Sequence, residues 1–228
     1  AILIDAGEQE DGDEIVRALK ERGVRRINLF LVTHYDRDHV GGAAYVMEHM
    51  EVDAVMMPDY EGDRPEYRDF LACLEGHDGV RRLTEKTELS IGHMQVIVYP
   101  ADDSETIQDT AGEYDNNLSL VTSIHYGKRG FLLTGDIEKE RMKQMLSAET
   151  DWHHDWIKMP HHGRYQKALA DFLEAVSPKE AVICCSGKNP AEEKTLKLLE
   201  EKEISVWDTS ERAVVTVCDG ENIRTEYD

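Results

Sequence analysis

The chain has 228 residues, 40% of them hydrophobic, which is enough for one large domain or two small ones with a substantial core. Its 47 acidic and 26 basic residues give a net charge of −21, which argues against a broad basic surface that grips duplex nucleic acid. No segment is long and apolar enough to span a membrane, and no signal peptide is visible. We therefore expect a soluble chain and slightly favour the cytoplasm, although the compartment stays open because the sequence begins inside an apolar strand, where a targeting signal would be missing.

Strand-like apolar runs alternate with amphipathic helical segments along the chain, which is typical of an α/β layered fold. We expect strands at 2–6, 27–33, 52–58, 94–100, 118–126, 130–135, 155–160, 180–186, 204–209 and 213–218. The expected helices are 13–22, 40–50, 65–75, 137–147, 165–176 and 191–202. A tight hairpin is predicted at 125–131, where Gly127 and Gly130 bracket two basic turn residues.

A polar, acidic stretch at 101–117 separates two similar series of strands and helices. We interpret residues 1–228 as a single domain with two pseudo-equivalent halves, about 1–112 and 113–228. Two such halves that pack sheet on sheet, with helices outside, predict a four-layer αββα sandwich.

The cysteines and one histidine pair are given structural interpretations. Cys184 and Cys185 lie in a strand-like run and are expected to be small core residues, as free cysteine usually is. No CxxC spacing occurs, so a thiolate zinc site is not indicated. His153 and His154 precede a strand and are predicted to lie on the surface.

The sequence HYDRDH, residues 34–39, places four ionisable groups directly after an apolar strand and before a helix. Ligands in α/β sheets bind at this edge, because loops converge there and helix N-termini point inward. The side chains of His34, Asp36, Asp38 and His39 can converge on one or two cations from a single short loop. The two aspartates beside buried apolar sequence need a counter-charge, which favours a metal site over a solvated turn.

Two further signals lie at strand ends in the second half of the chain. Asp136 follows Gly135 and precedes a helix, although a Gly-Asp junction alone is often only a helix cap. His161 and His162 end the run 155–160, and because neighbours on an extended chain point opposite ways, one of them can enter a site while the other takes a supporting or substrate position. Together the three signals predict a metal site at the seam between two sheets.

The order of these motifs resembles the metallo-β-lactamase superfamily. HYDRDH is similar to its HxHxDH signature with Asp36 replacing the second histidine, TGD at 134–136 to its bridging-aspartate motif, and ILIDAG at 2–7 to an early strand motif. More narrowly, THYDRDHVGG, DNNLSLV, FLLTGD and MPHHG resemble, in this order, the soluble hydrolase-like domain of ComEC competence proteins, whose signature is HxDxDH. The resemblance covers residue 2 to about 220, and members of this family begin with further strands, so the first strands are expected to be missing.

The resemblance implies an αββα sandwich with a two-metal site. His34 and Asp36 would hold the first ion, Asp38 and His39 the second, and Asp136 would bridge the two. We assign the remaining ligand to His161 and a supporting or substrate role to His162, although either histidine fits the motif. The superfamily's histidine before the bridging aspartate is absent here, so Asn116 or Asn117 would take its place, and a one-metal state stays open. A histidine that ComEC domains often carry before the last helix is also absent.

A divalent ion lowers the pKa of a bound water to about 7, and two ions ~3.5–4 Å apart suit a phosphodiester. We therefore expect a phosphodiesterase or nuclease that uses one or two zinc or manganese ions, with Asp38 orienting the water. The expected substrate is a small molecule or a single-stranded nucleic acid. Hydrolysis of an ester, lactone or thioester, and a non-catalytic metal-binding module, stay as alternatives because fold does not fix function.

Overall fold

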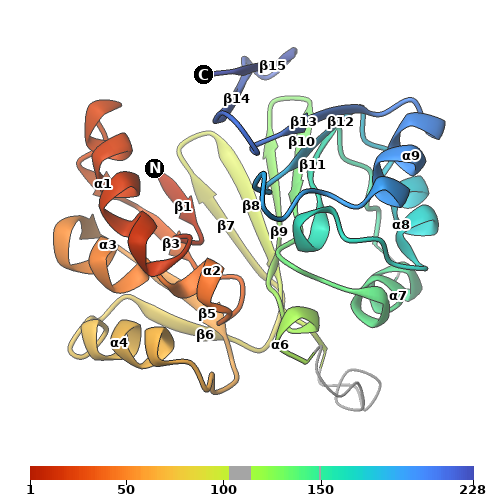
Figure 1. The fold of residues 1–228 in the computed structure, drawn as a ribbon. Helices are drawn as coiled ribbons and strands as arrows, with labels where there is room; N and C mark the ends of the chain where they lie inside the picture. Colours follow the sequence, from red (N-terminus) through yellow and green to blue (C-terminus); the bar gives the residue numbers. More distant parts are fainter. Residues whose placement is uncertain (103–113, 149) are drawn as a thin grey trace.

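The computed structural model describes residues 1–102, 114–148 and 150–228, and within these ranges two β-sheets lie face to face between two layers of helices (Figure 1). The first sheet has the strand order β1-β3-β5-β6, and all of its pairs are parallel. Its strands are β1 (Ile2–Ile4), β3 (Leu29–Leu31), β5 (Val55–Pro58) and β6 (Val80–Leu83). Three helices cover its outer face, namely α1 (Gly12–Glu21), α3 (Ala43–His49) and α4 (Pro65–Cys73).

The second sheet has seven strands in the order β13-β12-β11-β10-β9-β8-β7. The strands β10 to β13 pair in parallel, whereas β7 to β10 pair antiparallel. Its strands are β7 (Thr87–Ile91), β8 (Met94–Tyr99), β9 (Val121–Tyr126), β10 (Arg129–Leu133), β11 (Trp156–Lys158), β12 (Glu180–Ile183) and β13 (Ser205–Asp208). The helices α7 (Lys139–Ser147), α8 (Leu169–Val176) and α9 (Glu193–Glu201) cover its outer face.

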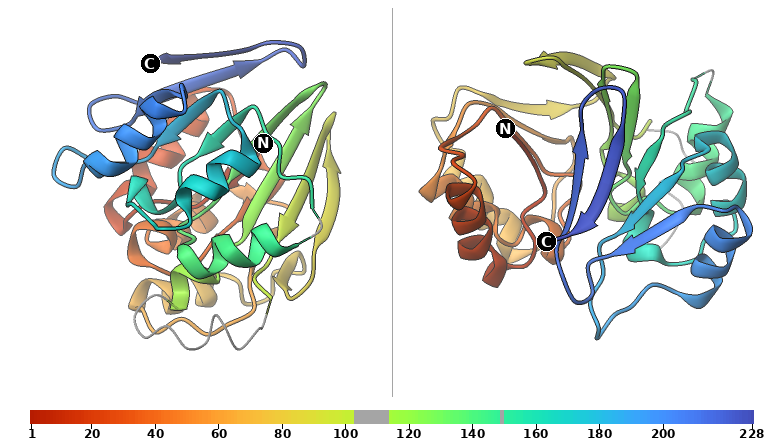
Figure 2. Two further views of the ribbon diagram at one scale, coloured as in Figure 1. Left: turned by 90° about the vertical axis from the view of Figure 1, so that its right-hand side faces the viewer. Right: turned by 90° about the horizontal axis from the view of Figure 1, so that it is seen from above.

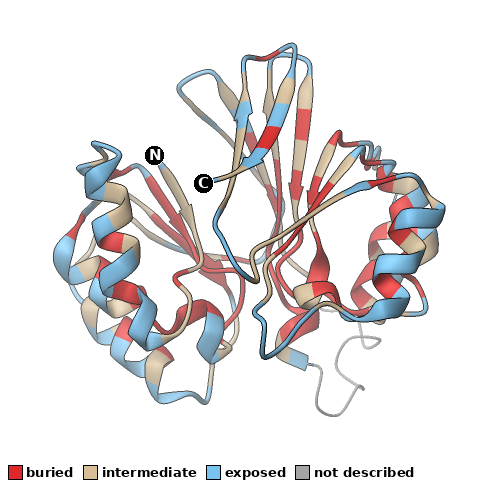
Figure 3. Ribbon diagram, turned by 45° about the horizontal axis from the view of Figure 1, so that its top comes forward, coloured by how far each residue is buried: buried red, intermediate tan, exposed pale blue. Residues whose placement is uncertain are grey.

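The side chains of β3 show why the first sheet has apolar residues at every position. Leu29 and Leu31 point into the cluster between the two sheets, whereas Phe30 packs with the helices on the opposite face. Successive side chains of a strand point to opposite faces, so a strand that is covered on both sides reads as a continuous apolar run. The buried residues accordingly lie along the two sheets and the inward helix faces, with exposed residues outside (Figure 3).

The remaining elements are short. They are η1 (Gln9–Asp11), β2 (Arg26–Ile27), α2 (Arg37–Val40), β4 (Glu51–Val52), α6 (Tyr114–Asn117), η2 (Pro160–Gly163), β14 (Val214–Cys218) and β15 (Ile223–Tyr227). The last two form a hairpin that lies across the top of the molecule between the two sheets (Figure 2). Ion pairs tie this hairpin to both sides: Arg22 of the first side contacts Asp228 at 2.7 Å, and Lys128 of the second contacts Glu221 at 3.0 Å.

The αββα sandwich predicted from the sequence is confirmed, as is the hairpin at Gly127, which joins β9 to β10. The sheets do not divide the chain at residue 112, because β7 and β8 precede that position and yet pair with β9. The expected boundary itself falls largely at 103–113, outside the described residues. No helix within the described ranges has the length and apolar character needed to cross a lipid bilayer.

The prediction that the paired cysteines are core residues is wrong. Cys184 and Cys185 are both intermediate in exposure, because they follow β12 at the sheet edge rather than lying inside the strand. Both residues line an open cleft, and Cys185 also packs against the apolar cluster on the outer face of the second sheet. Cys73 and Cys218 are also free and partly exposed.

The surface assignment is wrong for His154, although His153 is exposed as expected. His154 is 2% exposed, and its Nδ1 donates a hydrogen bond to the carbonyl of Trp152 at 2.7 Å. Its Nε2 therefore accepts from the hydroxyl of Ser123 at 2.6 Å, and that hydroxyl also lies 3.0 Å from Nε2 of His125. A histidine directly before a strand is buried here because both ring nitrogens find partners.

Burial lowers the pKa of His154, and the neighbouring His125 acts in the same direction. Below pH 6.5, the ordinary pKa of histidine, this residue therefore binds a proton in the unfolded chain that it does not bind in the folded chain. We expect this residue to reduce the free energy of unfolding as the pH falls below 6.5, by up to about 1.4 kcal/mol per pH unit, and to have no effect above it. Urea unfolding of wild type and His154→Gln between pH 5 and 8 tests this, since the variant should lose less stability in acid. His153→Gln, an exposed neighbour, should follow wild type; equal acid sensitivity in all three proteins would contradict the assignment.

Candidate metal centre

The polar side chains singled out in the sequence gather where strands of both sheets end at one edge. The segment after β3 carries His34 to His39, the segment after β10 carries Asp136, and β11 leads into η2 with His161 and His162. In Figure 1 these segments meet at the seam between the sheets, near α2. The two sheets thus contribute to one polar cluster, at the edge where ligands of α/β proteins bind.

The short helix α2 holds two of the side chains in place. Asp36 is its extended N-cap residue, and the backbone N–H of His39 donates to the carbonyl of Asp36 at 2.9 Å. Gly42 follows α2 and packs directly against the loop after β1, where a Cβ atom would lie 2.3 Å from the carbonyl oxygen of Ala6. Only glycine permits this approach, which brings Asp5 within reach of His39.

Four side-chain atoms lie close together around His162 and His39. Nε2 of His162 lies 3.0 Å from Oδ2 of Asp38, 3.0 Å from Oδ2 of Asp136 and 3.4 Å from Nε2 of His39. Nε2 of His39 lies 3.3 Å from Oδ2 of Asp136 and 4.0 Å from Oδ2 of Asp38. A tetrahedral ion ~2.1 Å from its nitrogen and oxygen ligands needs these atoms roughly 3.4 Å apart, so the mutual distances among His39, Asp136 and His162 fit one zinc-sized ion, with Asp38 beside His162.

His34 belongs to a second group on the other side of Asp136. The ligand atoms of His34, His39 and Asp136 all lie within 4.8 Å of one another. His34 is fully buried, and among the described residues its Nε2 has no hydrogen-bond partner; the nearest carboxylate oxygen is Oδ2 of Asp36, at 3.8 Å. A buried imidazole nitrogen left bare in this way is costly unless something binds it.

Hydrogen bonds fix the tautomer of all three histidines. Nδ1 of His162 donates to the carbonyl of Cys184 at 2.7 Å, and Nδ1 of His39 donates to Oδ2 of Asp5 at 2.8 Å. The hydroxyl of Thr33 donates to the same Asp5 oxygen at 2.8 Å.

The hydroxyl of Thr33 has already donated its single hydrogen to Asp5. It must therefore accept a hydrogen bond from Nδ1 of His34, which lies 3.0 Å away. Each ring consequently carries a proton on Nδ1 and directs its Nε2 into the cluster, which is how protein groups behind a metal site prepare histidine ligands.

Asp136 is held from behind by a buried lysine. Nζ of Lys158, at the end of β11, lies 3.2 Å from Oδ1 of Asp136 and donates to the carbonyl of Gly135 at 2.8 Å. The side chain of Asp136 is 4% exposed and that of Lys158 12%. Because Lys158 occupies Oδ1, Asp136 presents Oδ2 to the histidines.

The charges in the cluster reinforce one another. Burial disfavours protonation of His39, but Asp5 and Asp136 outweigh it and raise the pKa of His39 to about 10. Burial is likewise outweighed at His162, whose pKa rises to about 9 through its hydrogen bonds with Asp136 and Asp38.

The pKa values of two other groups in the cluster shift downward. Burial and the nearby His39 lower the pKa of His34 to about 3. Burial opposes ionisation of Asp136, but Lys158 and His39 hold its pKa well below the usual range. A cation that enters must therefore displace protons from His39 and His162.

The structure places His162, not His161, in this cluster. Nδ1 of His161 instead lies 2.6 Å from Oε1 of Glu138, to which Asn116 also donates at 3.3 Å. Oδ1 of Asn117 accepts from the backbone N–H groups of Glu138 and Arg141 and so caps the first turn of α7. Both asparagines thus contact residues at the start of α7.

The backbone at the two histidines differs from the extended conformation that the sequence argument assumed. His161 and His162 both adopt left-handed conformations, with φ of 44° and 52°, instead of the extended one. Asp5 is left-handed as well, at φ 61°. Such conformations cost of order 1–3 kcal/mol for a residue other than glycine and gather at functional sites.

Three supporting residues were not assigned roles from the sequence. Thr33 sets the tautomer of His34, Lys158 occupies one oxygen of Asp136, and Glu138 binds His161. Of the three, only Lys158 could have been noticed in the sequence, because it lies inside the strand run 155–160. A lysine that is buried in a strand requires a carboxylate partner.

The chemistry of the donors fits a divalent cation. Imidazole and carboxylate ligands suit zinc, whereas the additional carboxylate oxygens suit manganese. Asp38 and His162 also line an open cleft of about 310 Å³, so the cluster can be reached from solvent. The other residues that line this cleft are Glu8, Asp11, Cys184, Cys185, Ser186, Asn189 and Thr209.

The sequence profile of the Metallo-beta-lactamase superfamily matches residues 1–188. The chain belongs to this superfamily. It is therefore a metal-dependent hydrolase of the kind that binds one or two metal ions, and its histidine and aspartate cluster supplies candidate ligands. Within it, the chain is a ComEC-like domain: it is 27% identical over 206 residues to ComE operon protein 3 of Bacillus subtilis, a match that covers 88% of this chain. It is also 27% identical over 194 residues to Recombination protein 2 of Haemophilus influenzae, covering 83% of this chain.

The match covers 26% of the Bacillus protein and 22% of the Haemophilus protein, so the chain spans about a quarter of the curated relatives' length. Among solved structures, Tm1679, described as a metal-dependent hydrolase of the beta-lactamase superfamily, superposes with a TM-score of 0.59 at 13% identity. That superposition covers 92% of this chain and 86% of the other, and it shows the shared fold.

Proposed function

We propose that the chain is a metal-dependent phosphodiesterase that acts on single-stranded nucleic acid or a small nucleotide. The observation that carries the proposal is the convergence of three histidine Nε2 atoms with the carboxylates of Asp38 and Asp136. Each histidine is oriented by an acceptor behind it. This arrangement is prepared for cations and leaves a solvent-accessible cleft beside them.

The relatives favour a nucleic-acid substrate. The Haemophilus relative is named Recombination protein 2. Competence protein ComA of Neisseria gonorrhoeae is 25% identical to this chain over 169 residues, which cover 74% of this chain. The net charge of −21 disfavours a long duplex, because a protein that grips duplex DNA needs many basic contacts to phosphate. A strand held at one phosphate by metal ions avoids that requirement.

The proposed ligands form two sets that share Asp136. Asp38, His39, Asp136 and His162 would hold one ion, since the ligand atoms of His39, Asp136 and His162 lie 3.0–3.4 Å from one another. Oδ2 of Asp38 lies 3.0 Å from Nε2 of His162 and would complete the set. His34 and Asp136 would hold the other together with Asp36, whose Oδ2 lies 3.8 Å from Nε2 of His34. His162 replaces His161 in this assignment because it alone of the pair reaches the cluster. The second set has fewer ligands, so we expect it to bind more weakly.

A bound divalent ion would lower the pKa of a water and stabilise charge on the phosphate oxygens. Asp38 is the ligand best placed to orient that water, because its side chain is 45% exposed and lines the cleft. In the hydrolysis, a bond forms from the water oxygen to phosphorus while the phosphorus–oxygen ester bond breaks. Asp38 accepts the proton of the water, and the leaving oxygen takes a proton from solvent.

The test is cleavage of a fluorescent single-stranded oligonucleotide by protein loaded with manganese or zinc, with p-nitrophenyl acetate as the competing ester substrate. We expect metal-dependent cleavage of the oligonucleotide and a loss on the order of a thousandfold in Asp38→Asn, whose folding should be normal because the residue is partly exposed. Metal analysis should give one tightly bound ion per chain and a weaker second one.

Asp13→Asn, an exposed carboxylate on α1, serves as the control and should retain full activity. Hydrolysis of the ester alone would replace the phosphodiesterase assignment with an esterase. Bound metal without turnover of either substrate would support the non-catalytic module.

A further inference from the structure

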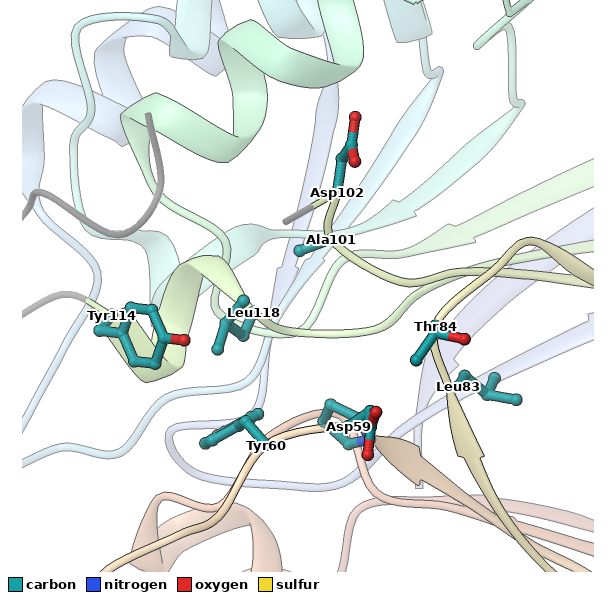
Figure 4. A pocket seen from close by; sticks show the side chains of 9 residues that line it. Asp59, Tyr60, Leu83, Thr84, Ala101, Asp102, Tyr114 and Leu118 are labelled. Carbon is teal, nitrogen blue, oxygen red and sulfur yellow. The ribbon is translucent and has the colours of Figure 1, made fainter. Parts of the chain in front are cut away.

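A second cavity lies along the same sheet edge, on the opposite side of the candidate metal centre from the open cleft. It has a volume of about 110 Å³ and is lined mainly by Pro58, Asp59, Tyr60, Thr84, Asp102 and Tyr114 (Figure 4). These residues follow the ends of β5, β6 and β8 or belong to α6. Because β5 runs parallel to β3, its end lies at the edge where β3 delivers His34.

One tyrosine connects the cavity directly to the metal centre. The hydroxyl of Tyr60 accepts a hydrogen bond from the backbone N–H of Tyr35 at 3.0 Å, and the two rings lie 4.5 Å apart. Tyr35 is the residue between His34 and Asp36 in the sequence. A group in the cavity therefore lies one aromatic ring away from the proposed ligands of the first ion.

The cavity combines two aromatic rings with two carboxylates. The rings of Tyr60 and Tyr114 pack edge to face, with centroids 6.2 Å apart at an angle of 76°. Tyr114 is 37% exposed, so its ring is the one that an occupant can reach. Asp59 and Asp102 supply only acceptor oxygens. The described residues that line the cavity include no lysine or arginine, which disfavours a phosphate group in the cavity itself.

We propose that this cavity binds a nucleobase that carries an exocyclic amino group, next to the phosphate that is hydrolysed. The proposal rests on the phosphodiesterase assignment and specifies its substrate. Aromatic side chains stack on any base, whereas the carboxylates accept hydrogen bonds from the amino groups of guanine, cytosine or adenine. Thymine would instead direct two carbonyl oxygens at the carboxylates, with only one N–H between them. The cavity should thus favour amino-bearing bases.

Three chromogenic substrates with the same scissile bond test the proposal: the p-nitrophenyl phosphodiesters of guanosine, thymidine and methanol. We expect wild type to hydrolyse the guanosine ester roughly tenfold better in kcat/KM than the thymidine ester. Tyr114→Leu should lower kcat/KM roughly tenfold for both nucleoside esters and leave the methyl ester within about twofold. Asp59→Asn should abolish the preference between the two nucleosides.

Tyr45→Leu is a matched control, because Tyr45 on α3 and Tyr114 are both 37% exposed and Tyr45 lies outside the cavity. It should change none of the three rates. Equal rates for the guanosine and thymidine esters, or an equal loss on all three substrates in Tyr114→Leu, would overturn the nucleobase site and leave the phosphodiesterase standing. Failure to hydrolyse even the methyl ester would overturn both.

Aromatic rings beside carboxylates also suit an organic cation. Tetraethylammonium is the probe for that occupant. If it inhibits wild type but not Tyr114→Leu, while the three esters react at equal rates, the cavity is a cation site and the nucleobase proposal is wrong.

Discussion

Asp136→Asn is expected to lower metal affinity on the order of a hundredfold or more and to destabilise the metal-free protein by about 3–5 kcal/mol. The carboxylate is 4% exposed and contacts Lys158, His39 and His162. Without this charge, the buried ammonium group of Lys158 loses its ion pair, and both proposed ion sites lose the ligand that they share. Isothermal titration with Mn²⁺ measures the first effect, and urea unfolding in the presence of a chelator measures the second.

A double variant separates the two effects. Asp136→Asn with Lys158→Met removes the buried charge along with its partner, so most of the lost stability should return while metal binding stays absent. Asp13→Asn should match wild type in both measurements. Retained metal affinity in Asp136→Asn would remove this residue from the proposed ligands.

Asp5→Asn is expected to weaken metal binding by about 10–100-fold although Asp5 touches no ion. Oδ1 of Asp5 accepts from the backbone N–H of Thr33, which keeps the amide oxygen of an asparagine on that side. The amide nitrogen would then face Nδ1 of His39 and the hydroxyl of Thr33 with donor hydrogens. His39 would have to carry its proton on Nε2, the atom that must bind the ion.

Metal titration of Asp5→Asn over a range of pH measures this effect, with far-ultraviolet circular dichroism to establish folding. Asp78→Asn, an exposed carboxylate elsewhere in the first half, is the control. Unchanged affinity in folded Asp5→Asn would mean that the tautomer of His39 is set by another group.

The sandwich could be predicted because apolar residues recur with a different spacing in its strands and in its helices, and because the two kinds of element alternate along the chain. The strands β6, β7 and β15 were not predicted, since VRRL, TELSI and IRTEY lack the continuous apolar run that marks a strand covered on both faces. Their burial patterns are mixed, with exposed or intermediate positions in each. Strands of this kind depend on their neighbours in the sheet more than on their own composition.

The candidate site was foreseen as a set of segments, but the choice between neighbouring side chains was not. HYDRDH, Asp136 and the His161–His162 pair meet at the seam between the sheets, as their positions at strand ends indicate. Which histidine enters the cluster depends on two left-handed residues, and neither composition nor spacing encodes that conformation. The contacts of Asn116 and Asn117 with α7 likewise follow from tertiary packing.

Because the proposed ligands come from both sheets, the geometry of the metal centre depends on how the two sheets pack against each other. Asp38 and His39 belong to the first sheet's side and Asp136 and His162 to the second, so a movement of one sheet by an ångström would separate the four atoms. Cation binding and sheet docking are then thermodynamically linked: at a concentration 100 times its dissociation constant, an ion would strengthen the closed arrangement by about 2.7 kcal/mol. A force that parts the sheets would, by the same linkage, release the ion.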